Sequence, residues 1–90
     1  MAGHTLHIVT RFRGATLLAM TADRSLGRPV HLLLLHDEVY RAVGDRVPAC
    51  DRVLVGADDL RRRGLPLGDN AVEYPEIVDA IAQAELVVSW

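Results

Sequence analysis

The side chain with the most reactive chemistry in this sequence is the thiol of Cys50, the only cysteine. Arg46 and Arg52 lie near it in the sequence and would favour its thiolate form, but Asp45 and Asp51 offset them. An apolar segment typical of a strand begins just after Cys50, which places the thiol at the amino end of the expected sheet. We therefore expect an unreactive surface or half-buried thiol, with a nucleophilic thiol as the alternative.

The four histidines do not form a local metal-binding pattern. His4 and His7 are three positions apart on an expected strand, so their side chains point to opposite faces. An odd spacing also separates His31 from His36. Neither pair can chelate a metal locally, and we expect neither a metal nor another cofactor.

Several polar residues follow the expected strands at their carboxyl ends, the edge where open parallel sheets collect ligands. The sequence has neither a GxGxxG nor a P-loop signature, which argues against a nucleotide-binding enzyme. His36 could approach Asp37 and Asp58 across neighbouring strand ends, but helix capping explains both carboxylates better than metal ligation does. The residues that we expect at this edge, as candidates for partner contacts, are Arg11, His36, Asp37, Glu38 and Asp58.

Alternating strand and helix patterns would position these residues. Short apolar runs predict strands at residues 6–9, 30–35, 53–55, 71–74 and 86–90. Helix-forming stretches between them predict helices near residues 15–20, 39–43, 58–63 and 75–84. Short crossovers through helices favour parallel neighbours, so the pattern predicts one compact α/β domain over residues 1–90 with a mainly parallel sheet.

The expected helix ends carry their own signals. Asp37 is expected to cap the short helix after the second strand, and Gly44 to end it. Asp58 or Asp59 is expected to cap the next helix, whose last turn holds an arginine cluster followed by Gly64. These polar and basic residues therefore have structural roles that need no separate function.

The composition excludes several classes of protein. Half of the 90 residues are apolar, the formal net charge is −2, and every basic residue is an arginine. The only basic cluster, Arg61 to Arg63, is typical of a solvated face, so direct nucleic-acid binding is not predicted. The longest apolar run, residues 32–35, is far shorter than the ~20 residues that span a bilayer. No signal-peptide pattern opens the chain, and we expect a cytoplasmic protein without membrane segments.

Four groups of residues occur in the order seen in the DsrH/TusB family. Residues 6–9 (LHIV) resemble the family's Leu-His-Thr-Val opening. Residues 34–40 (LLHDEVY) are similar to its Leu-Leu-Xaa-(Glu/Gln)-Asp-Gly-Val-Tyr segment. Residues 53–65 (VLVGADDLRRRGL) resemble its Val-Tyr-Ala-Leu-Xaa-Xaa-Asp-Leu-Xaa-Xaa-Arg-Gly-Leu. The fourth group, similar to Val-Asp-Tyr, Phe-Val-Asp and a terminal Xaa-Trp, is residues 72–74 (VEY), residues 77–79 (IVD) and Ser89-Trp90.

This resemblance, which covers nearly the whole chain, implies a three-layer α/β/α sandwich with a five-stranded parallel sheet. It also implies a heterohexamer with two copies each of three related subunits, so the partners would be TusC/DsrF-like and TusD/DsrE-like chains. In such complexes the TusD/DsrE-type subunit carries an acceptor cysteine that a TusA-like donor persulfidates, and a TusE/DsrC-like protein accepts the sulfur later. That cysteine follows the third strand, where this sequence has Gly56 and Ala57. The chain therefore cannot be the carrier at that site.

The sequence departs from the family pattern at three places. Some members of the sulfur-oxidising branch have a cysteine in the first helix, where residues 17–20 are Leu-Leu-Ala-Met, which favours the tRNA-thiolation branch. Glu38 replaces the family's common Gly after Asp37, and residues 11–13 (RFR) replace its Lys-Ser-Pro-Phe. Because the last two departures lie at the expected strand-end edge, we expect altered partner contacts there.

The leading hypothesis is a non-catalytic subunit of a TusBCD-type complex that supports 2-thiolation of the wobble uridine in certain tRNAs. Tyr40, Tyr74 and Trp90 are the candidates for structural or interface roles, and the chain could self-associate when it is expressed alone. The alternatives are a DsrH-like subunit in dissimilatory sulfur oxidation, a thiol sulfurtransferase that uses Cys50, and a stand-alone ligand-binding domain. No direct nucleic-acid contact is expected in any of them.

Overall fold

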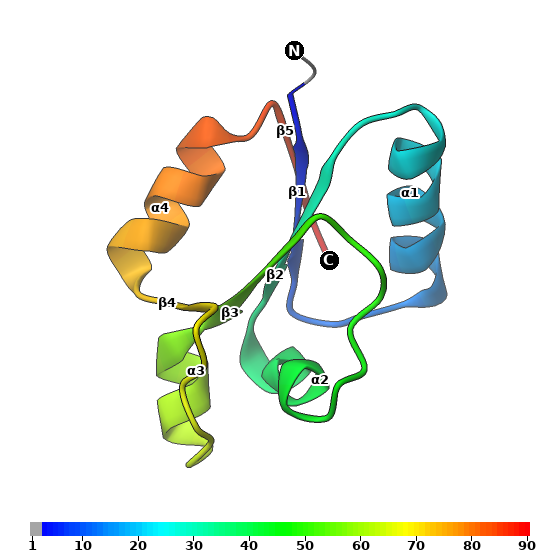
Figure 1. Cartoon of the computed structure of the whole chain (residues 1–90). Helices are drawn as coiled ribbons and strands as arrows, with labels where there is room; N and C mark the ends of the chain where they lie inside the picture. The colour runs from blue at the N-terminus through cyan, green and yellow to red at the C-terminus, as the bar shows by residue number, and fades with distance from the viewer. Residues whose placement is uncertain (1–2) are drawn as a thin grey trace.

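A computed structural model describes residues 3–90, which form five strands alternating with helices (Figure 1). The first half contains β1 (Thr5–Val9), α1 (Gly14–Ser25), β2 (Val30–Leu34), the 3-10 turn η1 (His36–Glu38) and α2 (Val39–Val43). The second half contains β3 (Arg52–Gly56), α3 (Ala57–Arg62), β4 (Ala71–Val72), α4 (Tyr74–Gln83) and β5 (Leu86–Ser89).

The strands form a single five-stranded sheet in the order β4-β3-β2-β1-β5, and every neighbouring pair is parallel. The chain builds the sheet outward from β1 through β2 and β3 to β4, and α4 then returns it across the sheet to place β5 on the other side of β1. The predicted α/β domain with a mainly parallel sheet is therefore confirmed, and the sheet is parallel throughout.

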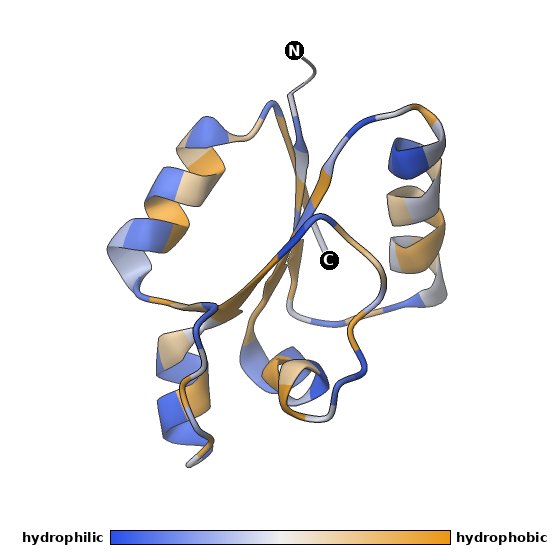
Figure 2. Ribbon diagram, viewed as in Figure 1, coloured by the Kyte–Doolittle hydropathy of each residue, from blue (hydrophilic) through white to orange (hydrophobic). Residues whose placement is uncertain are grey.

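Helices cover both faces of the sheet (Figure 1). Alternation along β1 sends the side chain of Val9 toward α1 and that of Leu6 toward α4, because successive strand residues face opposite ways. One buried cluster, beneath α1 and α2, contains Val9, Met20, Val30, Leu32 and Leu34. The cluster beneath α4 contains Leu6, Leu33, Leu54 and Val72. Figure 2 shows hydrophobic residues concentrated in the strands, with hydrophilic residues mixed through the helices.

The helix ends differ from the predicted caps. The residue before α3 is Gly56, because β3 runs directly into the helix and leaves no position for a separate cap; Asp58 and Asp59 instead occupy the first turn. Asp37 is also not a cap, since it lies inside η1 and its carboxylate binds an arginine of another element. The predicted helix ends are confirmed: Gly44 follows α2, and Gly64 follows the C-cap of α3 with φ +65°.

No helix in the described part of the chain is long and apolar enough to cross a membrane.

Candidate functional site

The carboxyl edge of the sheet contains a hollow of about 350 Å³ between the starts of α3 and α4. Its apolar wall includes Leu35, Val72 and Ile77, which come from the end of β2, from β4 and from α4. Asp58 and Tyr74 also line it, and Tyr74 is 76% exposed. The hollow lies where ligands collect in open parallel sheets, so it is the first candidate site.

The turn from β3 into α3 forms another wall of this hollow and contains no reactive side chain. Ala57 is buried, with 1% of its surface exposed. A side chain added at Gly56 would place its Cβ 2.7 Å from Cδ2 of Leu35, so Leu35 would have to move to accept it. The packing at Gly56 is thus fitted to glycine, and a cysteine at that position would require Leu35 to move.

Ion pairs neutralise the carboxylates around the hollow. Oε1 of Glu73 accepts a hydrogen bond from Nη1 of Arg61 at 2.9 Å, and Oε2 of Glu73 accepts a second one from Nη2 of the same arginine. The ion pair is therefore bidentate. The hydrogen bonds from Arg61 lower the pKa of the Glu73 carboxyl, and those to Glu73 raise the pKa of Arg61. Asp58 pairs with Arg62 across one turn of α3 at 3.5 Å. The hollow therefore presents paired charges and an apolar wall.

Arg63 connects two elements at this edge. Its Nε and Nη2 donate to Oδ1 of Asp37 in η1 at 3.0 and 2.9 Å. Its Nη1 donates to the backbone oxygen of Asp59 at 3.1 Å, and to the carboxylate of the same residue at 3.4 Å. The hydrogen bond to Asp37 raises the pKa of the guanidinium. Arg63 thus fastens η1 to the end of α3.

The remaining residues expected at this edge form separate contacts. Glu38 accepts a hydrogen bond from Nε of Arg41 at 2.6 Å, and the guanidinium carbon of Arg41 lies 4.3 Å from the centre of the Phe12 ring. The two departures from the DsrH/TusB pattern, at Glu38 and at residues 11–13, are therefore linked through Arg41. Arg11 and His36 are exposed, and His36, the first residue of η1, adopts φ +54°. Among residues 3–90, no three His, Cys, Asp or Glu side chains are placed to hold a metal ion.

Cys50 lies two residues before β3, at the opposite, amino edge of the sheet. Its Sγ donates to the backbone oxygen of Arg52 at 3.6 Å, and the half-buried side chain packs against the cluster beneath α1 and α2. Burial, followed by the charge of Asp51, raises the pKa of the thiol, although the hydrogen bond to Arg52 and the charge of Arg24 act the other way. A raised pKa lowers the fraction of nucleophilic thiolate at neutral pH.

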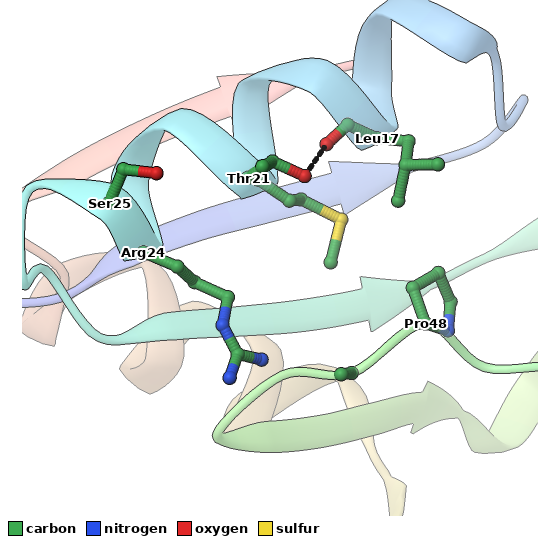
Figure 3. A pocket seen from close by; sticks show the side chains of 7 residues that line it. Leu17, Thr21, Arg24, Ser25 and Pro48 are labelled. Carbon is green, nitrogen blue, oxygen red and sulfur yellow. Dashed lines mark hydrogen bonds between the residues drawn. The ribbon is translucent and has the colours of Figure 1, made fainter.

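A second hollow, of about 370 Å³, lies between α1 and the segment that precedes Cys50 (Figure 3). Leu17 and Pro48 face each other across it, and the guanidinium of Arg24 points toward the same segment. Thr21 also lines it, but its hydroxyl donates to the backbone oxygen of Leu17 at 2.9 Å. The thiol is not part of the lining, so this hollow is an apolar groove with a cation at its rim.

A buried hydrogen-bonded chain around His7 was not predicted from the sequence. Nε1 of Trp90 donates to Nδ1 of His7 at 3.0 Å, and Nε2 of His7 lies 2.8 Å from Oδ2 of Asp23 in α1. Only 1% of His7 is exposed. The predicted alternation of faces indicates that His7 faces α1, but no local pattern identifies partners 16 and 83 positions away.

His4 and His31 form a second unpredicted pair, on the face of the sheet that α4 covers. Their rings stack with centroids 3.8 Å apart and an interplanar angle of 22°. Partial burial of His31, followed by the nearby His4 and Arg52, lowers the pKa of its imidazole, while Asp51 opposes the shift. The opposite orientations of His4 and His7 agree with the expectation that these two cannot chelate one metal ion.

The aromatic candidates have different environments. Trp90 packs against the cluster beneath α1 and α2, and its backbone continues the pairing with β1: its N–H donates to Ile8 at 2.8 Å and its carbonyl accepts from Thr10 at 2.9 Å. Tyr40 and Tyr74 are exposed by 43% and 76%. Trp90 therefore contributes to the packing of the core, whereas the two tyrosines lie at the surface.

A comparison with protein-family models found no match, and neither the curated proteins nor the solved structures gave a significant relative.

Proposed function

We propose that this protein is a TusB-like, non-catalytic subunit of a cytoplasmic sulfur-relay complex that supports 2-thiolation of the wobble uridine in tRNA. The observation that carries the proposal is the separation of the thiol from the candidate site. Cys50 lies at the amino edge with a raised pKa, whereas the turn at the carboxyl end of β3 consists of Gly56 and the buried Ala57. A subunit without a reactive side chain at this turn would support the relay by helping to assemble the complex.

The architecture supports the same proposal. The ordered motifs that resemble the DsrH/TusB family imply a five-stranded parallel sheet between layers of helices, and this chain has an all-parallel five-stranded sheet with helices on both faces. In a DsrE-like arrangement, Gly56 and Ala57 take the place of the acceptor cysteine of the TusD/DsrE-type subunit. The proposed partners are accordingly TusC/DsrF-like and TusD/DsrE-like chains.

Exposed apolar side chains provide surface for an assembly role. Leu17 and Leu18 on α1 are exposed by 47% and 73%, and Val78 and Ile81 on α4 by 45% and 40%. Single exposed apolar residues are normal, but groups on both outer layers are typical of surfaces that contact partner chains. A subunit between two partners would use surfaces of this kind.

Co-expression with the TusC-like and TusD-like proteins of the same genome tests the proposal. We expect the three chains to copurify and native mass spectrometry to show two copies of each. Deletion of this gene should remove most 2-thiouridine from the tRNAs concerned, and a Cys50→Ser copy should restore it. Failure to copurify, together with unchanged 2-thiouridine after deletion, would contradict the proposal.

The sulfur-oxidising branch is the closest alternative. A DsrH-like subunit would share the fold and the partners, so the neighbouring genes separate the two branches: adjacent sulfite-reductase genes favour sulfur oxidation. The thiol sulfurtransferase alternative predicts a persulfide on Cys50 after incubation with a charged donor, which mass spectrometry detects. The hollow at the carboxyl edge favours a further alternative, a stand-alone ligand-binding domain, and a thermal-shift screen with nucleotides, metals and small anions tests it.

A further inference from the structure

The two hydrogen bonds of the buried His7 determine which of its ring nitrogens has the proton. An indole nitrogen can only donate, so Nδ1 of His7 is the acceptor of the 3.0 Å bond from Trp90. The two rings are inclined by 20° with their centroids 6.2 Å apart, which suits a bond between ring edges. The single proton of the neutral ring is therefore on Nε2, which donates to Oδ2 of Asp23 at 2.8 Å.

A second proton on this ring would oppose Trp90. Both ring nitrogens of a protonated histidine are donors. Protonation at Nδ1 would place two N–H donors 3.0 Å apart, so Trp90 would lose its acceptor. The bond from Nε2 to Asp23 would remain and become stronger, because it would then join opposite charges. The added charge thus breaks one contact of His7 and keeps the other.

Asp23 supplies the counter-charge that a protonated His7 needs. Its carboxylate faces the imidazole from α1, and Arg28, in the turn after α1, lies 3.6 Å from its other oxygen. The neighbouring strands add no charge at this level, since the residues in register with His7 are Leu32 in β2 and Val88 in β5. The carboxylate offsets part of the cost of burying the imidazolium, whereas the more exposed Arg28 opposes it.

The contact that protonation would break holds the end of β5. This strand pairs with β1 alone, and the backbone of Trp90 continues the pairing through Ile8 and Thr10. The indole of Trp90 packs against the cluster beneath α1 and α2. Two donors facing each other would force this side chain to turn away. An edge strand that loses such a contact opens locally at a lower free energy than the rest of the sheet.

We infer that His7 and Trp90 form a pH-sensitive contact: neutral His7 accepts the indole N–H and holds β5 against β1, and protonation of His7 at Nδ1 releases Trp90 and loosens the strand. The contact opens as the pH falls through the titration of His7. The inference rests on a junction outside the candidate site and does not depend on the sulfur-relay proposal.

Nitrogen NMR of the full chain tests the inference without any substitution. At about pH 8, Nδ1 of His7 should show the chemical shift of an unprotonated nitrogen, and Nε2 that of a protonated one. The pH is then lowered to about 5, the range in which histidines titrate. After correction for the intrinsic pH dependence of exchange, the indole N–H of Trp90 should exchange about tenfold faster or more, because a buried hydrogen bond is lost. The backbone N–H of Trp90 should show the same step, with the midpoint of the His7 nitrogen shifts.

Three variants separate this contact from a general sensitivity to acid. Trp90→Phe keeps an aromatic ring without the N–H, so the protection of β5 should be lower at pH 8 and show no step as His7 titrates. Asp23→Asn removes the counter-charge and should move the step to lower pH. His31→Gln is the matched control and should keep the step, because His31 faces the opposite side of the sheet.

Several results would overturn the inference. It fails if the proton of neutral His7 is on Nδ1, if Trp90 keeps its protection after His7 is protonated, or if His7 stays neutral until the whole chain unfolds. It also fails if the step persists in Trp90→Phe or disappears in His31→Gln, because either result would assign the acid sensitivity to another group. Relay subunits take no part in these measurements, so the two proposals can fail separately.

Discussion

At the scale of single residues, the chemistry of this chain depends on where each reactive side chain lies in the sheet. The sequence placed Cys50 before the third strand, and that position at the amino edge is what the structure shows. The local environment raises the pKa of the thiol, although arginines flank it in the sequence. The raised pKa is caused by burial, because the side chain of Cys50 packs against the cluster beneath α1 and α2. The charged neighbours of Cys50 in the sequence do not reveal this packing.

Under the proposed relay function, Cys50→Ser should leave sulfur transfer intact. Serine keeps a donor close to the carbonyl of Arg52, and the thiol is outside the candidate site. We expect 2-thiouridine content equal to that of cells with the wild-type gene, and a melting temperature only slightly lower because the site is half-buried. A loss of 2-thiouridine comparable with deletion of the gene, with normal protein levels, would show that Cys50 takes part in sulfur transfer.

The lowered pKa of His31 predicts a pH-dependent stability. In the folded protein, the imidazole of His31 binds a proton less readily than it does in the unfolded chain. At pH values above its ordinary pKa of 6.5 the imidazole is neutral in both states, so the contribution of His31 to the free energy of unfolding is complete there. It should decrease as the pH falls below 6.5 and level off once His31 is protonated in the folded state as well. Urea unfolding of the wild type and of His31→Gln at several pH values measures the difference. A slope in His31→Gln that matches the wild-type slope would refute the assignment.

At the scale of elements, local signals predicted where helices end better than where they begin. Gly44 and Gly64 follow their helices as expected, because a short-range backbone requirement determines that position. The expected cap at Asp58 failed because β3 enters α3 without a loop, which depends on the sheet and not on the local sequence. The partner of Asp37 is Arg63, 26 positions away, so that contact also required the fold.

Arg63 should stabilise the joint between η1 and α3 more than its neighbour does. Its side chain is 20% exposed and binds both Asp37 and Asp59, whereas Arg62 is 73% exposed and has one contact at 3.5 Å. Arg63→Gln should lower the melting temperature by several degrees and increase hydrogen exchange in η1 and α2. Arg62→Gln is the matched control and should change neither, because exposed single pairs contribute little. Equal effects of the two substitutions would contradict this role.

At the scale of the whole molecule, the order of the strands required information that the sequence pattern lacks. The alternation of elements predicted a parallel sheet, but a strand after α4 could have joined either edge. The structure places β5 beside β1, where Trp90 reaches His7 across a sequence separation of 83 positions. His7, in turn, contacts Asp23 of α1, so three elements meet at a single buried side chain.

This junction predicts that Trp90 holds the last strand in place. Trp90→Ala removes the indole N–H that His7 accepts and the packing against the cluster beneath α1. Truncating a buried Trp typically costs ~3–5 kcal/mol, and because Trp90 is only partly buried we expect about 2–4 kcal/mol here. A domain of this size has about 5–15 kcal/mol of stability, so the loss should lower the melting temperature by more than about 8 °C.

Hydrogen exchange should show where that loss is concentrated. Since β5 pairs with β1 alone, protection should decrease first in β5 and in the adjoining α4, while β2 and β3 retain theirs. Tyr74→Ala is the matched control, because this aromatic side chain is 76% exposed and its removal should change neither melting nor exchange. If Trp90→Ala melts with the wild type, or if protection decreases equally in all five strands, Trp90 does not anchor β5 to the sheet.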